Sequence, residues 1–430
     1  MGSAACWIGA TACQCLCSLF GLCGATKKVF SRIGYVMFMV LWIILSIIFL
    51  FYGHYIFKIP FIEDYVSCDT DNDACIGVSA VLRTSFTLTL FHLLLFLVCL
   101  CGGDVVSALN EGAWPLKIIV VMAFFVLTLF MPTNFFKGFG YVAMVASFLY
   151  LIYQMILIID MAYSWNSNWV GKYDVSNSGS GGNTTCWAVI IITATVLTFG
   201  AAILIYVLLY LYEASSVADY IVISAPIVAG VVYTGLTVSP IVKGGSIFTC
   251  GLILLFQSFL TASVQLSRPD SKSDATSKSA YFWQMAIGLG YMFFVLFYVG
   301  AKTKKTEVEK KNEEPAQQVT SKAGDVVAEE AGDEGKVPLA TSSGKEADEV
   351  QKVTLATAMF HLLMAFASMY YSMVISNWGS PTVNGKETQF FSSKILSYGA
   401  LLAGQWLGVL FFIWSLIAPR VCPSREFSYN

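Results

Sequence analysis

The chain has 430 residues, of which 57% are hydrophobic and 12% are charged, and its formal net charge is −2. An average soluble domain carries about 25% charged residues, so this composition argues against a soluble globular protein. A net charge close to zero gives no electrostatic support for nucleic-acid binding. We therefore expect an integral membrane protein.

The N-terminal segment, residues 1–33, is rich in cysteine. The first cations are Lys27 and Lys28, so no basic region precedes an apolar run and no cleavable signal peptide is indicated. The cysteines lack the paired spacing of a zinc site, so no metal is expected. Packing against lipid is one role open to them, and palmitoylation, chiefly at Cys13, Cys15 and Cys17, is the second. The cysteines of this segment are Cys6, Cys13, Cys15, Cys17 and Cys23.

Ten apolar segments are long enough, or nearly so, to cross a hydrocarbon core of about 30 Å. Their continuous apolarity is typical of helices, because it lacks the alternation of a membrane barrel. The fold class expected is an all-α polytopic membrane protein. The segments lie near 34–53, 80–101, 115–131, 139–163, 187–211, 218–236, 246–266, 280–300, 353–377 and 396–419.

The loop before the second segment contains Cys68 and Cys75 among acidic residues. Positive charge in the short flanks places this loop outside the cytosol, where disulfides form, so we expect a bridge between the two cysteines. Arg83 follows at the start of the second segment. It either attracts lipid phosphate groups or anchors the helix end.

The fourth segment contains an acidic residue, Asp160, followed by a Ser-Trp-Asn box with Asn166 and Trp169. The absence of proline from 135 to 173 predicts one continuous helix of about 38 residues. A helix ending at Tyr163 would bring Asp160 to the negative end of its dipole. Either the helix continues through the box, or Asp160 has a cationic partner, for which Lys117 is the candidate. Snorkelling to the interface and a role in substrate passage also stay open for Asp160.

Histidines occur only at His54, His92 and His361. Those in apolar helices, His92 and His361, are interpreted as hydrogen-bonded packing residues rather than catalysts. A phosphate loop and a nucleophile–base pair are absent from the sequence, so we expect neither an enzyme nor a cofactor. After the ninth segment, Asn377 and Trp378 echo the Ser-Trp-Asn box.

Residues 301–352 hold 9 lysines and 12 acidic residues without an aromatic residue, so a disordered loop is expected. The flanks assigned to the cytosol carry 12 Lys or Arg against 7 in the others, which places both termini and this loop in the cytosol. The sequon at Asn183 would then be unused. The organisation expected is a segment 1–33, helices one to eight in 34–300, the loop, helices nine and ten in 353–419, and a tail at 420–430.

Five ordered blocks give the chain a resemblance to the serine incorporator family of membrane proteins. The most specific is QMILIIDMAYSWNSNWV at 154–170. The remaining four are the cysteine-rich start at 6–23, LNEGAWPLKIIVV at 109–121, FHLLMAFASMYYSMVISNWGSP at 360–381 and WLGVLFFIWSLIAPRVCPSREF at 406–427. A further block, SFLTASVQLSRPDSKSD at 258–274, departs from the family pattern in its Arg-Pro-Asp order and lacks a cysteine usual there, which puts a disulfide or contact in that loop in doubt.

The resemblance implies about ten helices in two bundles joined by a long, tilted fourth helix. It also implies handling of serine-derived lipids, phosphatidylserine and sphingolipids, with passive scrambling between leaflets as the favoured mechanism. A serine carrier or a scaffold for lipid-synthesising enzymes is the alternative. A carrier would show discontinuous helices near the midplane, for which Gly230, Gly235, Gly244 and Gly245 are candidates.

Membrane phospholipids and sphingolipids are the partners expected, in the plasma membrane or endomembranes, and an oligomer is compatible with the sequence. The polar side chains assigned to the lipid path fall into two groups. Those for an inner mouth are Asp160, Lys117, Asn166 and Trp169, and those for an outer mouth are Arg83, Asn377 and Trp378, with His361 deeper in the membrane.

Overall fold

The computed structural model describes 27–57, 63–66, 68, 73–102, 104–177, 184–240, 242, 245–268, 281–301, 342–379, 382–383, 386–387, 390 and 394–422. Several sequence predictions lie outside these residues. They concern the N-terminal cysteines, the sequon at Asn183, the candidate Gly244, most of the charged loop and most of the C-terminal tail.

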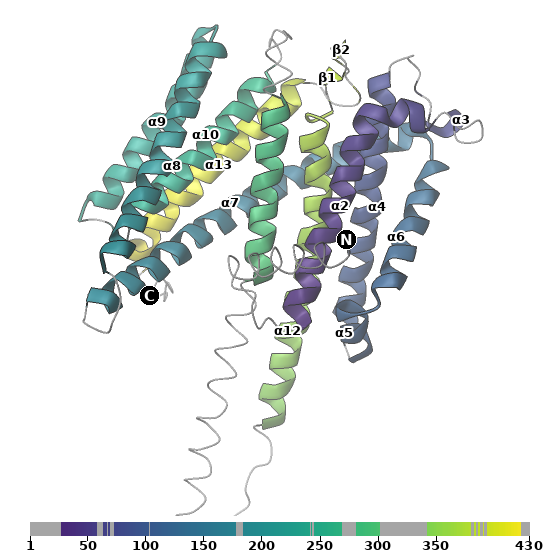
Figure 1. Ribbon diagram of the computed structural model, residues 1–430, viewed down its shortest axis with the longest axis horizontal. Coiled ribbons are helices and arrows are strands. Elements are labelled where there is room, and N and C mark those ends of the chain that lie inside the picture. Colours follow the sequence, from purple (N-terminus) through teal and green to yellow (C-terminus); the bar gives the residue numbers. More distant parts are fainter. Residues whose placement is uncertain are drawn as a thin grey trace, which may run out of the picture. The chain divides into compact units, whose positions relative to one another are not determined.

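Helices dominate the described residues (Figure 1). One two-stranded antiparallel pairing joins β1 (Thr382–Val383) to β2 (Lys386–Glu387), with Thr382 opposite Glu387. The helices are α2 (Lys27–Ile56), α3 (Glu63–Val66), α4 (Asp73–Cys101), α5 (Asp104–Glu111), α6 (Trp114–Leu129), α7 (Thr133–Asn177), α8 (Thr184–Tyr212), α9 (Val217–Val238), α10 (Ile247–Leu266), a helix over Tyr281–Ala301, α12 (Ser342–Ile375) and α13 (Lys394–Val421).

All ten predicted apolar segments are helical. Within the described part of the chain, nine helices are long and apolar enough to cross a membrane, and α6 is a shorter apolar helix of 16 residues. At 1.5 Å per residue α6 is about 24 Å long, somewhat less than a typical hydrocarbon core. These helices confirm the all-α polytopic membrane class. The helix α12 begins at Ser342, inside the range that the sequence assigns to the charged loop.

The helix α7 is the longest element, with 45 residues and no break. It begins directly after Pro132, and it continues through the Ser-Trp-Asn box to Asn177. The predicted continuous helix over 135–173 is therefore confirmed, and the helix extends beyond that range at both ends.

The chain divides into two compact units, which we call the first unit and the second unit. The helices α2, α4, α12 and the helix over Tyr281–Ala301 each contribute to both, whereas α7 to α10 and α13 belong wholly to the second unit. The first unit comprises Met1–Ile44, Thr87–Val126 and Leu296–Ala365; the second comprises Leu45–Phe86, Leu127–Val295 and Phe366–Asn430.

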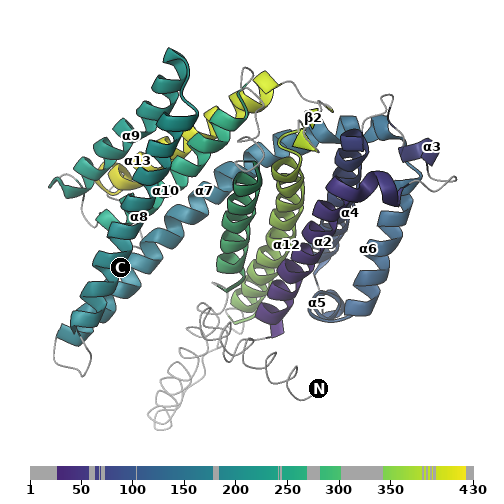
Figure 2. The ribbon, with the colours of Figure 1, turned by 45° about the horizontal axis from the view of Figure 1, so that its top comes forward.

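Within the second unit, α10 is the central helix. It packs against α7, α8, α9 and α13, as both ribbon views show (Figures 1 and 2). In its most apolar window 83% of the residues are buried, against 6% for α8. The helix α8 therefore turns most of its apolar side chains outward, as expected of a lipid-facing helix, while α10 forms the core of this unit.

Candidate functional site

The N-terminal end of α10 meets the Ser-Trp-Asn box of α7. Ser246, the residue before α10, donates a hydrogen bond from its hydroxyl to Asn166 Oδ1 at 2.6 Å. The Trp165 and Trp169 rings stack with their centroids 5.7 Å apart. The centroid of the Trp169 ring lies 5.1 Å from that of Phe248 of α10. Two predicted path residues, Asn166 and Trp169, thus lie together beside the start of α10.

Asp160 lies six residues before Asn166 in the middle of α7. Because α7 continues to Asn177, the negative end of its dipole is far from this carboxylate. The sequence left open whether the helix runs on through the box or ends near Tyr163, and the structure shows that it runs on. Asp160 is half-buried.

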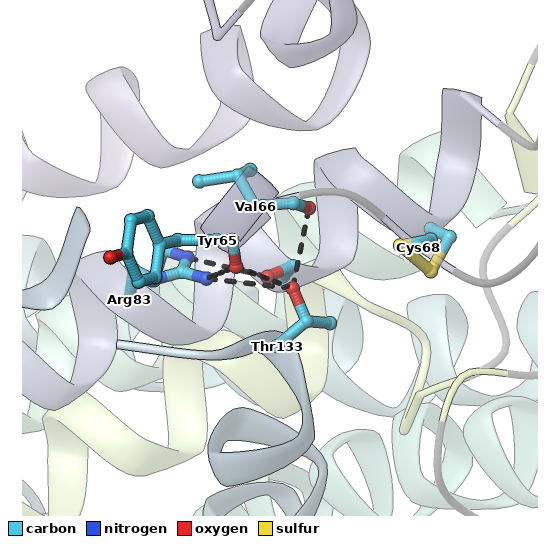
Figure 3. The surroundings of a disulfide bond; sticks show 7 residues. Tyr65, Val66, Cys68, Arg83 and Thr133 are labelled. Carbon is cyan, nitrogen blue, oxygen red and sulfur yellow. Dashed lines mark hydrogen bonds between the residues drawn. A yellow bond between two sulfur atoms is a disulfide. The ribbon is translucent and has the colours of Figure 1, made fainter. Parts of the chain in front are cut away.

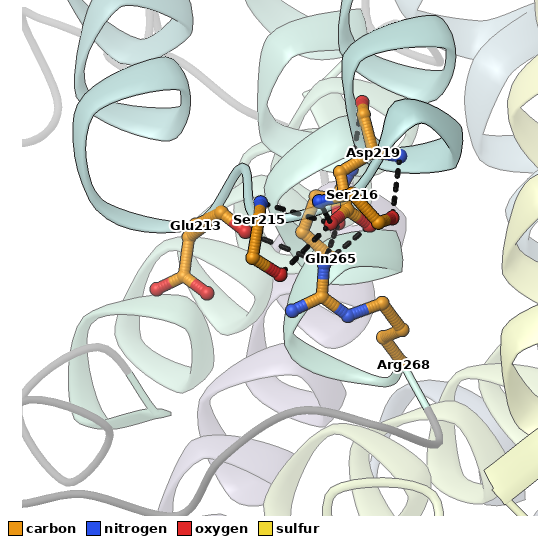
Figure 4. A network of polar contacts seen from close by, with 6 residues as sticks. All are labelled: Glu213, Ser215, Ser216, Asp219, Gln265 and Arg268. Atoms are coloured by element: carbon orange, nitrogen blue, oxygen red, sulfur yellow. Dashed lines mark hydrogen bonds and ion pairs between the residues drawn. The ribbon is translucent and has the colours of Figure 1, made fainter.

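The C-terminal end of α10 carries a second polar cluster, shown in Figure 4. Asp219 is 2% exposed and forms an ion pair with Arg268, which follows α10. Its Oδ2 accepts hydrogen bonds from the backbone amides of Ser215 at 3.0 Å and Ser216 at 2.8 Å. The Ser216 side chain in turn accepts from the Asp219 amide, which completes a capping box at the start of α9.

Glu213 adds a second carboxylate next to this pair. Arg268 donates to its backbone oxygen at 3.3 Å, while its carboxylate points away from the cluster in Figure 4. Burial raises the pKa of Glu213 above its usual value, Arg268 lowers it, and the negative charge of Asp219 raises it. This end of α10 therefore holds one ion pair, with a second carboxylate nearby that makes no ion pair with Arg268.

Polar side chains also follow one face of α10 between its two ends. Gln257, Thr261 and Gln265 are spaced four residues apart, so they share a face. Gln265 Nε2 reaches the backbone oxygen of Asp219 at 3.4 Å, which joins this face to the cluster at the C-terminal end. We call this set, with the clusters at its two ends, the α10 polar line.

A separate polar network lies in the first unit, centred on Asn110 of α5. Its backbone oxygen accepts from Ser31 at 2.7 Å, from Lys117 Nζ at 2.8 Å and from the Tyr35 hydroxyl at 3.1 Å. Its Oδ1 lies 2.8 Å from His361 Nε2. We call these residues, together with His92, the Asn110 network.

The two histidines of this network contact each other, with 3.2 Å between their Nδ1 atoms and no exposed surface on either side chain. If His361 Nε2 donates to the Asn110 carbonyl, its Nδ1 must accept, so His92 Nδ1 donates. The interpretation of both as hydrogen-bonded packing residues agrees with this arrangement. Lys117 Nζ also lies 4.7 Å from the Tyr35 ring centre and 4.6 Å from that of Trp114.

Arg83 is fully buried in the second unit and donates to backbone oxygens (Figure 3). Its Nη1 reaches the oxygens of Thr128 and of Met131, the latter at 2.9 Å, and its Nη2 that of Tyr65 at 3.1 Å. The guanidinium also lies over the Phe136 ring, 4.3 Å from its centre. Of the two roles considered, anchoring of the helix end fits this environment better than attraction of headgroups.

Cys68 and Cys75 form a disulfide beside Arg83, with their Cα atoms 6.3 Å apart (Figure 3). This is the bridge that the sequence predicts. It links the segment after α3 to the first turns of α4.

Asn377 and Trp378 lie in the turn that ends α12. Both have left-handed backbone conformations, with φ of 44° and 55°, and the Trp378 amide donates to Met373 O at 2.7 Å. Asn tolerates this conformation, but a Trp there is uncommon. Trp378 is 3% exposed, so it packs inside the turn rather than at an open surface.

The structure brings some of the predicted path residues together and separates others. Asn166 and Trp169 share one place in the second unit, and Lys117 and His361 share the Asn110 network of the first unit. Lys117 and Asp160 belong to different units, so their pairing stays a prediction.

Sequence analysis did not single out Asp219 or Arg268 as site residues. A Ser-x-x-Asp pattern before an apolar run indicates the start of a helix. The sequence at Ser216 and Asp219 fits this pattern and could have predicted the helix cap. Arg268 stands in the block whose Arg-Pro-Asp order departs from the family pattern, and it makes the ion pair with Asp219.

Comparison with known proteins adds a family to this geometry. A model of the serine incorporator (Serinc) family matches residues 5–425. A probable serine incorporator of Nematostella vectensis is 27% identical over 93% of this chain and 91% of its own length. Serine incorporator 2 of Mus musculus is 25% identical over 96% of this chain and 95% of its own length. A probable serine incorporator of Monosiga brevicollis is 25% identical over 99% of this chain and 96% of its own length.

Proposed function

Because this chain belongs to the serine incorporator family, we propose that it handles serine-derived lipids, phosphatidylserine and sphingolipids, by passive scrambling between leaflets. The observation that carries this proposal is the α10 polar line. It has a partly exposed polar cluster at each end and polar side chains between them.

The dimensions of α10 suit this role. Its 20 residues make a helix of about 30 Å, the thickness of a typical hydrocarbon core. The polar clusters at its two ends therefore fall at the depths where headgroups of the two leaflets lie. Crossing between them costs a headgroup its hydration, and polar groups along the way reduce that cost.

The chemistry of the two ends suits a lipid that carries both charges. At the C-terminal end Arg268 attracts phosphate, while the half-buried Glu213 attracts an ammonium group. At the N-terminal end Asn166 and Ser246 offer hydrogen bonds beside the Trp165 and Trp169 rings, which prefer the membrane interface. The phosphate and the ammonium group of phosphatidylserine thus each have a partner at the C-terminal end of α10.

The path residues inferred from sequence enter this proposal in two ways. Asp160, Asn166 and Trp169 lie on α7, which packs against α10, and we assign them to the N-terminal end of the path. Lys117, His361, Arg83, Asn377 and Trp378 have contacts that suit structural roles, and a direct part in lipid passage stays a prediction for them.

A serine carrier or a scaffold for lipid-synthesising enzymes is the second candidate. A carrier of this kind commonly uses helices that are interrupted near the midplane. Here α9 is continuous over Val217–Val238 through Gly230 and Gly235, and α10 is continuous over Ile247–Leu266. These unbroken helices favour scrambling over serine transport.

The test is reconstitution of the purified protein in liposomes with labelled phosphatidylserine, with lipid flip and serine uptake assayed in parallel. We expect flip well above that of protein-free vesicles, without serine uptake. Flip no faster than in protein-free vesicles would refute the proposal. Serine uptake without flip would establish the carrier.

Variants at the two ends of α10 sharpen this test. Glu213→Gln removes a charge from the C-terminal cluster, and Asn166→Leu removes the hydrogen bond to Ser246. We expect each to slow lipid flip. Asp174→Asn is the matched control, because Asp174 is an exposed carboxylate near the end of α7 outside both clusters. Equal flip rates in all three variants would show that scrambling does not depend on the α10 polar line.

A further inference from the structure

The middle of the α10 polar line contains two buried amide side chains, Gln257 of α10 and Gln405 of α13. They are 1% and 0% exposed. Gln405 Nε2 donates to the Thr261 hydroxyl at 2.6 Å. The other three polar atoms of the two amides, both atoms of Gln257 and Oε1 of Gln405, have no hydrogen-bond partner among the described residues.

The two amides converge on one place. Thr261, which accepts from Gln405, donates its own hydroxyl proton to the Gln257 backbone oxygen at 2.8 Å. Gly408 lies one helical turn beyond Gln405, and a Cβ there would lie 3.0 Å from Gln257 Nε2. A side chain at position 408 would therefore take the space next to the Gln257 amide.

Unpartnered polar atoms of this kind are costly in a membrane protein. A buried amide without a partner costs about 1–3 kcal/mol, and three such atoms lie here. Native proteins satisfy nearly all buried polar groups, and internal water does so where protein groups do not. One further hydroxyl without a partner among the described residues, that of Tyr233, comes from α9 of the same unit.

We infer that Gln257, Gln405 and Thr261 form an internal binding site for water in the middle of the membrane-spanning part of the second unit. Gln257 is the eleventh of the 20 residues of α10, so the site lies about 15 Å from either end. An amide offers both donors and acceptors, which suits an uncharged ligand such as water. None of the three side chains carries a charge to hold a phosphate.

The site acts as a hydrated midpoint of the lipid path, and this role rests on the proposed function. Water held at mid-depth lowers the desolvation cost for a headgroup that moves between the two ends of α10. Binding of water itself does not depend on lipid transport, so it is tested without lipid flip.

Radiolytic footprinting with X-ray pulses reports on such water, because hydroxyl radicals form from bound water and oxidise the nearest side chain. Met155 is the reporter, since its side chain reaches the same point beside Gly408 and is only 1% exposed. Met292 of the same unit is 0% exposed and is the matched control. We expect Met155 to be oxidised much faster than Met292 in the wild-type protein.

The variant Gln257→Leu with Gln405→Leu removes the amides. We expect Met155 oxidation to fall at least about tenfold, because the loss of even one net hydrogen bond weakens water binding by about that factor and the variant removes two amides. Equal oxidation of Met155 and Met292 in the wild-type protein would overturn the inference, even if the variant does not fold. Unchanged Met155 oxidation in a folded variant would overturn it too. A variant that loses Met155 oxidation but flips lipid at the wild-type rate would support the water site. It would also show that the site has no role in the lipid path.

Discussion

The Asn110 network and the α10 polar line both place polar side chains among apolar helices. They differ in how many of these polar atoms have hydrogen-bond partners. In the Asn110 network nearly every polar group has a protein partner, and one atom, His92 Nε2, lacks one among the described residues. In the middle of the α10 polar line Gln257 and Gln405 leave three polar atoms without such a partner.

This difference separates two uses of polarity in a membrane protein. A network whose groups satisfy one another holds helices in register and has no need of a ligand. A set of neutral groups that do not satisfy one another is stable only if it binds something polar. The Asn110 network is accordingly a structural clamp, and the middle of the α10 polar line is where a ligand is expected. Four predictions test this distinction.

The largest loss is expected at Asp219, which is fully partnered although it belongs to the second unit. Asp219→Leu leaves Arg268 and the backbone amides of Ser215 and Ser216 without their acceptor, so we expect about 3–5 kcal/mol of destabilisation. Thermal unfolding in detergent measures it. Asp174→Leu, at an exposed carboxylate, serves as the control. Similar losses in the two variants would show that the saturated cluster is not a structural clamp.

The central pair of variants compares the two regions directly. Asn110→Leu takes the acceptor from His361 Nε2, and we expect a loss of about 1–3 kcal/mol because a buried donor is left unpaired. Gln257→Leu leaves no protein side chain unpaired, so its melting temperature should stay the same or rise. A larger decrease in melting temperature for Gln257→Leu than for Asn110→Leu would contradict the distinction between the two regions.

A smaller loss is expected from Gly408→Ala. The added Cβ meets the end of the Met155 side chain and Gln257 Nε2, and because the Met155 methyl group can move aside we expect about 1–2 kcal/mol. Gly399→Ala on the same helix has no atom within 4 Å of the added carbon and is the matched control. An equal gain in stability in both variants, as expected from helix propensity alone, would argue against close packing at Gly408.

The smallest effect concerns pH. Burial raises the folded-state pKa of Glu213, so the folded state binds its proton more tightly than the unfolded state does. The resulting stability is fully present below the unfolded pKa of about 4.3 and is lost as pH rises through the folded pKa. Relative to Glu213→Gln, the wild-type melting temperature should decrease as pH rises from about 4 to 7. A constant difference would mean that Glu213 does not titrate in this range.

Features with a local signal were predictable from the sequence. Continuous apolarity located all ten apolar helices, the absence of proline predicted α7, and the compartment assigned to the loop predicted the disulfide between Cys68 and Cys75. The centre of the Asn110 network was not predictable. Three of its hydrogen bonds go to a backbone oxygen, which every residue has, and members that contact each other lie up to 269 positions apart in sequence.

Most partners of Arg83 were hidden for the same reason, because its guanidinium donates chiefly to backbone oxygens, besides the hydroxyls of Ser79 and Thr133. Asp219 shows the opposite case. Its capping box is a local pattern, but its ion pair with Arg268 depends on how α9 and α10 pack.

The length of α7 makes the protein sensitive to bilayer thickness. Its 45 residues extend about 68 Å, whereas a helix tilted by 40°, the upper end of the usual range, needs only about 26 residues to cross a 30 Å core. At least about 19 residues of α7 therefore lie in the headgroup region or in water at any common tilt. A thicker membrane draws more of them into hydrocarbon. The depth of Asp160 is thus set by the host membrane as well as by the fold.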